Sequence, residues 1–97
     1  MLVKRRILGN GHVRVTFILL EPGVESVDLL GDFTSWRPDR AMRRTRGGSW
    51  RVTYDLERGK EFQYRYLVDG ARWVNDPTAD RYVPNPFGSD NSVVVTS

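Results

Sequence analysis

Cysteine is absent from the 97 residues of this chain. No disulfide can therefore staple the fold, and no thiolate is available for metal binding or nucleophilic catalysis. Long apolar runs are missing too. The amino-terminal MLVKRRIL lacks the apolar stretch of a signal peptide, and no segment approaches the roughly 20 apolar residues that cross a bilayer. We therefore expect a cytoplasmic protein that binds no membrane and is stabilised by packing alone.

Catalytic and metal-binding motifs are also missing. The single histidine, His12, has no serine or cysteine partner in a recognisable turn, and no zinc, P-loop or dinucleotide pattern occurs. The twelve acidic residues are scattered, without a spacing that marks the carboxylate pair of a glycosidase. We therefore predict that the chain is not an enzyme and has no catalytic residues, metal site or cofactor.

Helical periodicity is almost absent, and a period of two residues takes its place. Apolar and polar residues alternate over residues 13–19, 50–56 and 62–68, and turn signals such as Asp69-Gly70 separate these segments. Six to eight short strands at this spacing are typical of an antiparallel β-sandwich. We expect one all-β domain over residues 1–97, with residues 1–10 as a leading strand or arm. The side chains expected to face inward are Phe17, Val27, Leu29, Trp50, Tyr54, Phe62, Tyr64 and Tyr66.

The carboxyl-terminal part is less regular. Three prolines between Pro77 and Asn91 predict a long ordered loop rather than a strand. We expect the final strand at residues 92–96.

The chain has a net charge of +3, and thirteen of its fifteen basic residues are arginine. Six of these arginines lie between Arg37 and Arg51, where Asp39 is the only acid. They stand singly or in pairs among turn residues. We therefore expect a solvated surface and no nucleic-acid partner, with an anionic partner as the alternative.

The three tryptophans differ in context. Trp50 is in phase with the apolar residues of its strand and should lie in the core. Trp36 and Trp73 stand among polar and turn-forming residues, each after a strand that ends in glycine. Two exposed indoles predict a surface that buries a ligand. The alternative is that both rings close the open ends of the sandwich.

A sugar would suit such a pair of rings. A pyranose presents a face of C–H groups to an aromatic ring, while its hydroxyl rim needs planar polar groups. Gln63 and Arg65 lie on the outward face of their strand, Asn75 follows Trp73, and Asn91 precedes the last strand. Taken singly, residues of these types are more often ordinary surface or turn residues than ligand contacts.

Three motifs in order carry a family resemblance: GDFTSW (31–36), YRYLVDGARWVNDP (64–77) and FGSDNSVVV (87–95). Over about residues 13–95 the chain resembles family-48 carbohydrate-binding modules. These are early-set immunoglobulin-like domains of glycogen branching enzymes, of isoamylases and of the AMP-activated protein kinase beta subunit. The resemblance implies an immunoglobulin-like sandwich that binds glucan.

The resemblance also implies site residues. Trp36 and Trp73 match the two tryptophans that stack on glucose in the glycogen-binding members, and Asn91 matches their asparagine. Arg65 stands where those members have a lysine that contacts sugar. Phe87 matches a leucine that packs on the sugar ring, and Ser89 a threonine beside it.

The sequence and the resemblance leave two candidate functions. The first is noncatalytic binding of α-1,4-linked glucan, a glycogen- or starch-like polysaccharide or a maltooligosaccharide. The second is an interaction module that docks on a glycogen-metabolising enzyme and binds sugar weakly or not at all.

Overall fold

This computed structural model describes residues 1–7 and 9–97. These residues contain nine strands and two short 3-10 helices, η1 (Asp32–Thr34) and η2 (Arg46–Gly48). The strands are β1 (Leu2–Ile7), β2 (His12–Leu20), β3 (Val27–Gly31), β4 (Arg43–Arg44), β5 (Ser49–Glu57), β6 (Glu61–Val68), β7 (Arg72–Val74), β8 (Arg81–Pro84) and β9 (Asp90–Val95). No helix in the described residues is long and apolar enough to cross a membrane.

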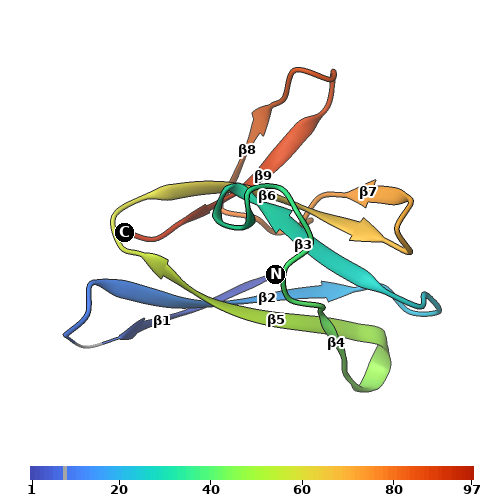
Figure 1. The fold of residues 1–97 in the computed structure, drawn as a ribbon, viewed down its shortest axis with the longest axis horizontal. Coiled ribbons are helices and arrows are strands. Elements are labelled where there is room, and N and C mark those ends of the chain that lie inside the picture. The colour runs from blue at the N-terminus through green and yellow to red at the C-terminus, as the bar shows by residue number, and fades with distance from the viewer. Residues whose placement is uncertain (8) are drawn as a thin grey trace.

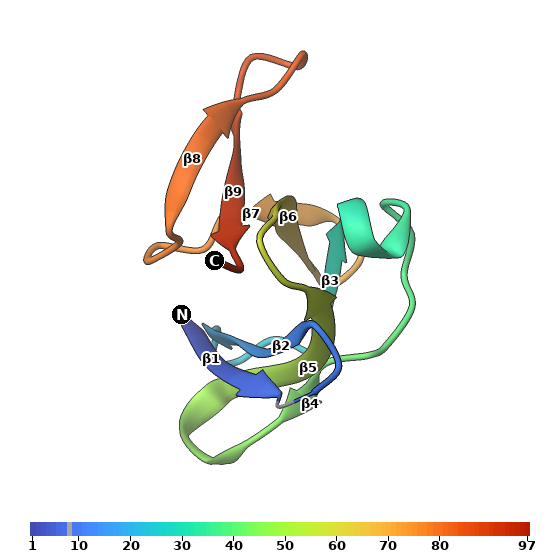
Figure 2. The same cartoon turned by 90° about the vertical axis from the view of Figure 1, so that its left-hand side faces the viewer.

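The strands form two antiparallel sheets that face each other (Figures 1 and 2). The four-stranded sheet has the order β1-β2-β5-β4. The five-stranded sheet has the order β3-β6-β9-β8, with β7 paired to β6. The all-β, immunoglobulin-like antiparallel sandwich expected from the sequence is confirmed.

The core lies between the two sheets. Side chains of β5 alternate between buried and exposed over most of the strand, which gives the four-stranded sheet one apolar face. Phe17 of β2 is at the centre, with its ring centroid 5.0 Å from that of Tyr64 across the sandwich and 5.4 Å from that of Phe33. Phe62 is partly buried and packs against this cluster. The other predicted core residues are all buried: Phe17, Val27, Leu29, Trp50, Tyr54, Tyr64 and Tyr66.

The prediction of a long loop between Pro77 and Asn91 is wrong. Residues Arg81–Pro84 form β8, which pairs with β9 in a hairpin that projects from the sandwich (Figure 2). Proline is tolerated because β8 is an edge strand and Pro84 is its last residue. The N–H that proline lacks is therefore not needed for a hydrogen bond to a neighbouring strand. The final strand also begins earlier than expected, at Asp90.

A fully buried carboxylate, Asp76, links the two sheets. One oxygen accepts hydrogen bonds from the Met1 α-amino group (2.7 Å) and from the backbone N–H of Thr78 (2.9 Å). The other accepts from the hydroxyls of Tyr64 (2.8 Å) and Tyr66 (3.4 Å). A buried charge is tolerated only when its oxygens are satisfied in this way.

Stability should fall in alkaline solution because of these tyrosines. Burial raises the pKa of the Tyr64 and Tyr66 hydroxyls well above the ordinary value, and the charge of Asp76 acts in the same direction. Unfolded tyrosines lose their proton near pH 10 while the folded ones keep it, so the unfolded state binds fewer protons. The free energy of unfolding should therefore decline above about pH 10, by ~1.4 kcal/mol per pH unit for each tyrosine.

Urea unfolding between pH 8 and pH 11.5 measures this decline. Tyr64→Phe removes one of these titrating hydroxyls and should make the decline shallower. Equal slopes for the two proteins would contradict the assignment.

Candidate functional site

An open groove of about 550 Å³ lies on the outer face of the five-stranded sheet. Side chains from the turn after η1, from β6, β7 and β9 and from the β8–β9 loop contribute to it, so several segments distant in the sequence meet here. Its lining residues are Trp36, Gln63, Arg65, Trp73, Asn85, Pro86, Phe87 and Asn91.

Trp36 is held at the groove by the turn that contains η1. Its backbone N–H donates to the Gly31 carbonyl (2.9 Å), and its indole N–H donates to Oδ1 of Asp32 (3.1 Å). Oδ2 of the same carboxylate accepts from the backbone N–H of Gln63 in β6 (2.7 Å). Asp32 thus fixes the indole relative to the sheet, with 36% of the residue left exposed.

Two backbone features make this turn possible. A Cβ on Gly31 would lie 2.6 Å from the Gln63 carbonyl oxygen, so only glycine lets β3 approach β6 so closely. Ser35 and Trp36 both adopt left-handed backbone conformations, each with φ 56°. Such a conformation is unfavourable for residues other than glycine and is enriched at functional sites.

Trp73 reaches the same groove from β7. The tight β6–β7 turn has Asp69 and Gly70 in left-handed conformations (φ 53° and 68°), which is the Asp-Gly hairpin signature of the sequence. The register pairs Trp73 with Leu67. Directly paired residues share a face, so Trp73 projects on the outer face that also carries Arg65. It is 45% exposed.

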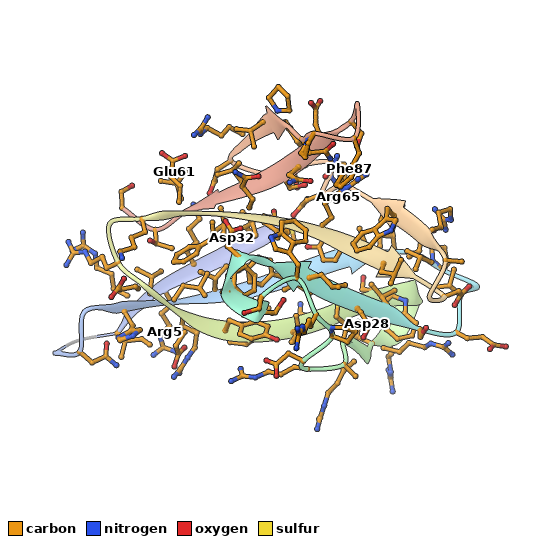
Figure 3. All side chains as sticks on the ribbon, turned by 45° about the horizontal axis from the view of Figure 1, so that its top comes forward. Arg5, Asp28, Asp32, Glu61, Arg65 and Phe87 are labelled. Atoms are coloured by element: carbon orange, nitrogen blue, oxygen red, sulfur yellow. The ribbon has the colours of Figure 1, made fainter. Side chains whose placement is uncertain are left out.

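The β8–β9 loop is organised by Asn85. Its side-chain oxygen accepts hydrogen bonds from the backbone N–H groups of Phe87 (2.9 Å) and Ser89 (3.3 Å). Its amide group donates to the Ser89 hydroxyl (2.8 Å) and to Oδ1 of Asn91 (3.2 Å). These bonds place the Phe87 ring at the tip of the loop, 90% exposed, close to Arg65 (Figure 3).

Polar groups line the floor of the groove. Nη1 of Arg65 donates to the Ser89 hydroxyl (3.2 Å). Its Nε is buried and has no hydrogen-bond partner among the residues that the structure describes. The Asn91 amide donates one N–H to Oε1 of Gln63 (3.0 Å), which leaves a second N–H for a ligand.

The groove combines aromatic rings with amide and guanidinium groups, and none of the described residues that line it is acidic. Exposed rings favour a ligand with an apolar face, and the planar polar groups favour hydroxyls at its edge. Among the residues that the structure describes, no group of three or more His, Cys, Asp or Glu side chains is placed to hold a metal ion.

Comparison with known families agrees with this chemistry. The profile of the family described as the glycogen recognition site of AMP-activated protein kinase matches residues 13–97. The chain belongs to this family. No curated protein sequence matches the chain.

The fold also occurs in a solved structure of an enzyme. Enterochelin esterase from Shigella flexneri superposes with a TM-score of 0.78 at 15% sequence identity, over 98% of this chain and 32% of the esterase. The chain thus spans about a third of that protein. At this identity the likeness shows the fold alone.

For this member of the glycogen-recognition family, five of the six predicted site residues line one groove: Trp36, Arg65, Trp73, Phe87 and Asn91. Ser89 does not line it and instead supports Arg65 and Asn85. Asn75 is also elsewhere, donating to the Asp90 carbonyl (2.8 Å). The sugar-binding role of all six stays a prediction.

Sequence reasoning missed three contributors. Asn85 and Pro86 fell in the segment predicted as an undivided loop, and only the hairpin brings them to the groove. The sequence pattern identifies Asp32 only as one of the polar, turn-forming residues around Trp36. A usable signal was available, because an Asp four residues before an exposed tryptophan is a natural partner for its indole N–H.

Replacing Asp32 with alanine should weaken maltoheptaose binding about fivefold. The carboxylate holds the indole N–H of Trp36, and a hydrogen bond of this kind contributes about 1 kcal/mol to the favoured ring position. Calorimetric titration measures the change. Asp55→Ala, which removes an exposed acid from the four-stranded sheet, is the matched control and should bind like the wild type. Equal affinities for Asp32→Ala and the control would contradict this role.

Proposed function

We propose that this chain is a noncatalytic module that binds α-1,4-linked glucan, either a glycogen- or starch-like polysaccharide or a maltooligosaccharide. The observation that carries the proposal is the pair of exposed indoles, Trp36 and Trp73, that line one groove on the five-stranded sheet. The family match supports a glucan as the ligand.

Each groove residue has a distinct role in this proposal. The two indoles stack on the C–H faces of successive glucose units, and Phe87 packs against the edge of the sugar. The guanidinium group of Arg65, which lines the groove, and the second amide N–H of Asn91 donate to hydroxyls. Ser89 holds the Arg65 guanidinium in position.

The expected affinity is modest. Each indole removes about 100 Å² of apolar area from water on stacking, worth about 2.5 kcal/mol, so two stacks contribute about 5 kcal/mol. Hydrogen bonds to hydroxyls replace bonds to water and add roughly 1 kcal/mol each, while lost translational and rotational freedom opposes association. The dissociation constant for maltoheptaose should lie between about 10 μM and 1 mM.

The groove offers no basis for cleavage of the bound glucan. Hydrolysis of a glycosidic bond uses two carboxyl groups on either side of it, roughly 5 to 9.5 Å apart. The described residues that line the groove include no Asp or Glu.

Affinity electrophoresis with glycogen in the gel, run at two salt concentrations, tests the proposal together with calorimetry on maltoheptaose. Glycogen should retard the protein equally at both salt concentrations, because the ligand is neutral. Steep loss of retardation with salt would indicate a polyanion site instead. No retardation and no heat at millimolar sugar would overturn glucan binding and favour docking on a glycogen-metabolising enzyme.

A further inference from the structure

The outer face of the four-stranded sheet carries a second exposed surface, on the opposite side of the sandwich from the groove. The backbone N–H of Ile18 in β2 donates to the Met1 carbonyl (2.9 Å). On its other side Ile18 pairs with Arg51 of β5, and Arg51 pairs with Arg43 of β4. These four residues form one row across the sheet. Their neighbours along β2 and β5, such as Phe17 and Val52, point into the core, so the row lies on the outer face, although Ile18 itself is only 7% exposed.

One half of this face is apolar. Met1, Val3 and Leu20 are each about half exposed or more, at 51%, 48% and 66%. Val3 pairs with Thr16, two residues before Ile18 on the same face. A contiguous group of exposed apolar side chains on a β-sheet face is typical of an interaction surface.

The other half is basic. Arg40, Arg43 and Arg51 line a hollow of about 350 Å³ whose described lining residues include no acid. Nη1 of Arg40 donates to the Thr53 carbonyl (2.6 Å), and its guanidinium lies 4.4 Å from the centroid of the Tyr54 ring, so this side chain is held in place. Like charges directly opposite in a sheet, as in Arg43 and Arg51, are unfavourable without an anion between them.

The acids on this face are already occupied. Asp55 forms an ion pair with Arg14 (2.9 Å), and Glu57 forms one with Lys60. Among the described residues, no ion pair involves the remaining arginines of the face: Arg5, Arg40, Arg43 and Arg51. The face therefore has arginines without an ion-pair partner beside apolar surface. Arg5 lies on the side of the molecule away from Arg65 and Phe87 (Figure 3).

We propose that this face docks a protein partner whose surface combines apolar side chains with flanking carboxylates. The carboxylates meet Arg43 and Arg51, and the apolar side chains cover Val3 and Leu20. The arginines between Arg37 and Arg51 are exposed, as expected for a solvated surface, and the register of β4 and β5 brings together two that are dispersed in the sequence. Since the groove lies on the opposite face, both surfaces can be occupied at once.

A defined probe tests this proposal without glucan. A random copolymer of glutamate and leucine is titrated into the ¹⁵N-labelled protein and compared with poly-glutamate and with oligo-deoxythymidine. The copolymer should shift amide signals of β1, β2, β4 and β5, should bind at least tenfold more tightly than poly-glutamate, and should weaken as salt rises. Absence of shifts on this face would overturn the proposal, as would equal binding of oligo-deoxythymidine.

Variants separate the two halves of the face. Arg51→Ser and Leu20→Ser should each weaken copolymer binding at least fivefold. Arg58→Ser removes the same charge from the exposed turn between β5 and β6 and should leave the affinity unchanged. If Arg58→Ser has the effect of Arg51→Ser, binding is diffuse electrostatic attraction and the docking proposal fails. If Leu20→Ser has no effect, the apolar half is not part of the surface and the proposal fails as stated.

Discussion

Alanine at Trp36 or at Trp73 is expected to weaken maltoheptaose binding by roughly 30-fold or more and to leave the fold intact. Each substitution removes one stacking surface, and a loss of about 2 kcal/mol corresponds to that factor. The fold should tolerate both changes, because the two rings are among the exposed aromatic residues and neither belongs to the core cluster.

Calorimetry of the wild type and both variants measures the loss, and circular dichroism verifies that each variant is folded. Phenylalanine at the same positions keeps an aromatic face of smaller area, so Trp36→Phe and Trp73→Phe should retain a good part of the affinity. Folded alanine variants that bind as tightly as the wild type would contradict stacking at these rings.

The largest stability effect is expected for Trp50→Ala, which should lower the free energy of unfolding by about 3–5 kcal/mol. Trp50 is 5% exposed, its indole N–H donates to the Glu21 carbonyl (3.1 Å), and the Arg44 guanidinium lies 4.9 Å from its ring centroid. Truncation leaves a cavity and an unpaired carbonyl. For a domain whose total stability is roughly 5–15 kcal/mol, this is a large share.

Urea denaturation followed by far-UV circular dichroism gives the value. Trp50→Phe is the control, since it fills most of the volume but loses the indole hydrogen bond, and it should cost less than half as much. A loss below about 1 kcal/mol for Trp50→Ala would show that the ring is not a core residue.

The sandwich was predictable from the sequence because β5 and most of β6 are buried on one face only. In β5 the alternation of Trp50, Val52, Tyr54 and Leu56 with polar residues fixes both the strand and its inward side. The same reasoning failed for β8, since prolines argue against a strand unless its place at a sheet edge is known. That place depends on pairing with β9, which no local pattern reveals.

The groove was predictable in part for a similar reason. Trp36 and Trp73 are recognisable because an indole in a polar turn has no core to join. The contributions of Asn85 and Asp32 depend on contacts between segments: Asn85 bonds to Asn91 across the hairpin, and Asp32 bonds to the backbone of β6. Such contacts depend on the register in which the strands pair. A single sequence specifies that register only for strands that have one buried and one exposed face.

The backbone at Ser35 and Trp36 has a consequence for selection experiments. A left-handed conformation costs a residue with a side chain on the order of 1 kcal/mol or more, and glycine adopts it freely. A library screened only for resistance to heat should therefore replace Trp36 with glycine, whereas a library screened on glycogen-coated beads should retain the ring. Selection for thermal stability and selection for glycogen binding are therefore expected to favour different residues at position 36.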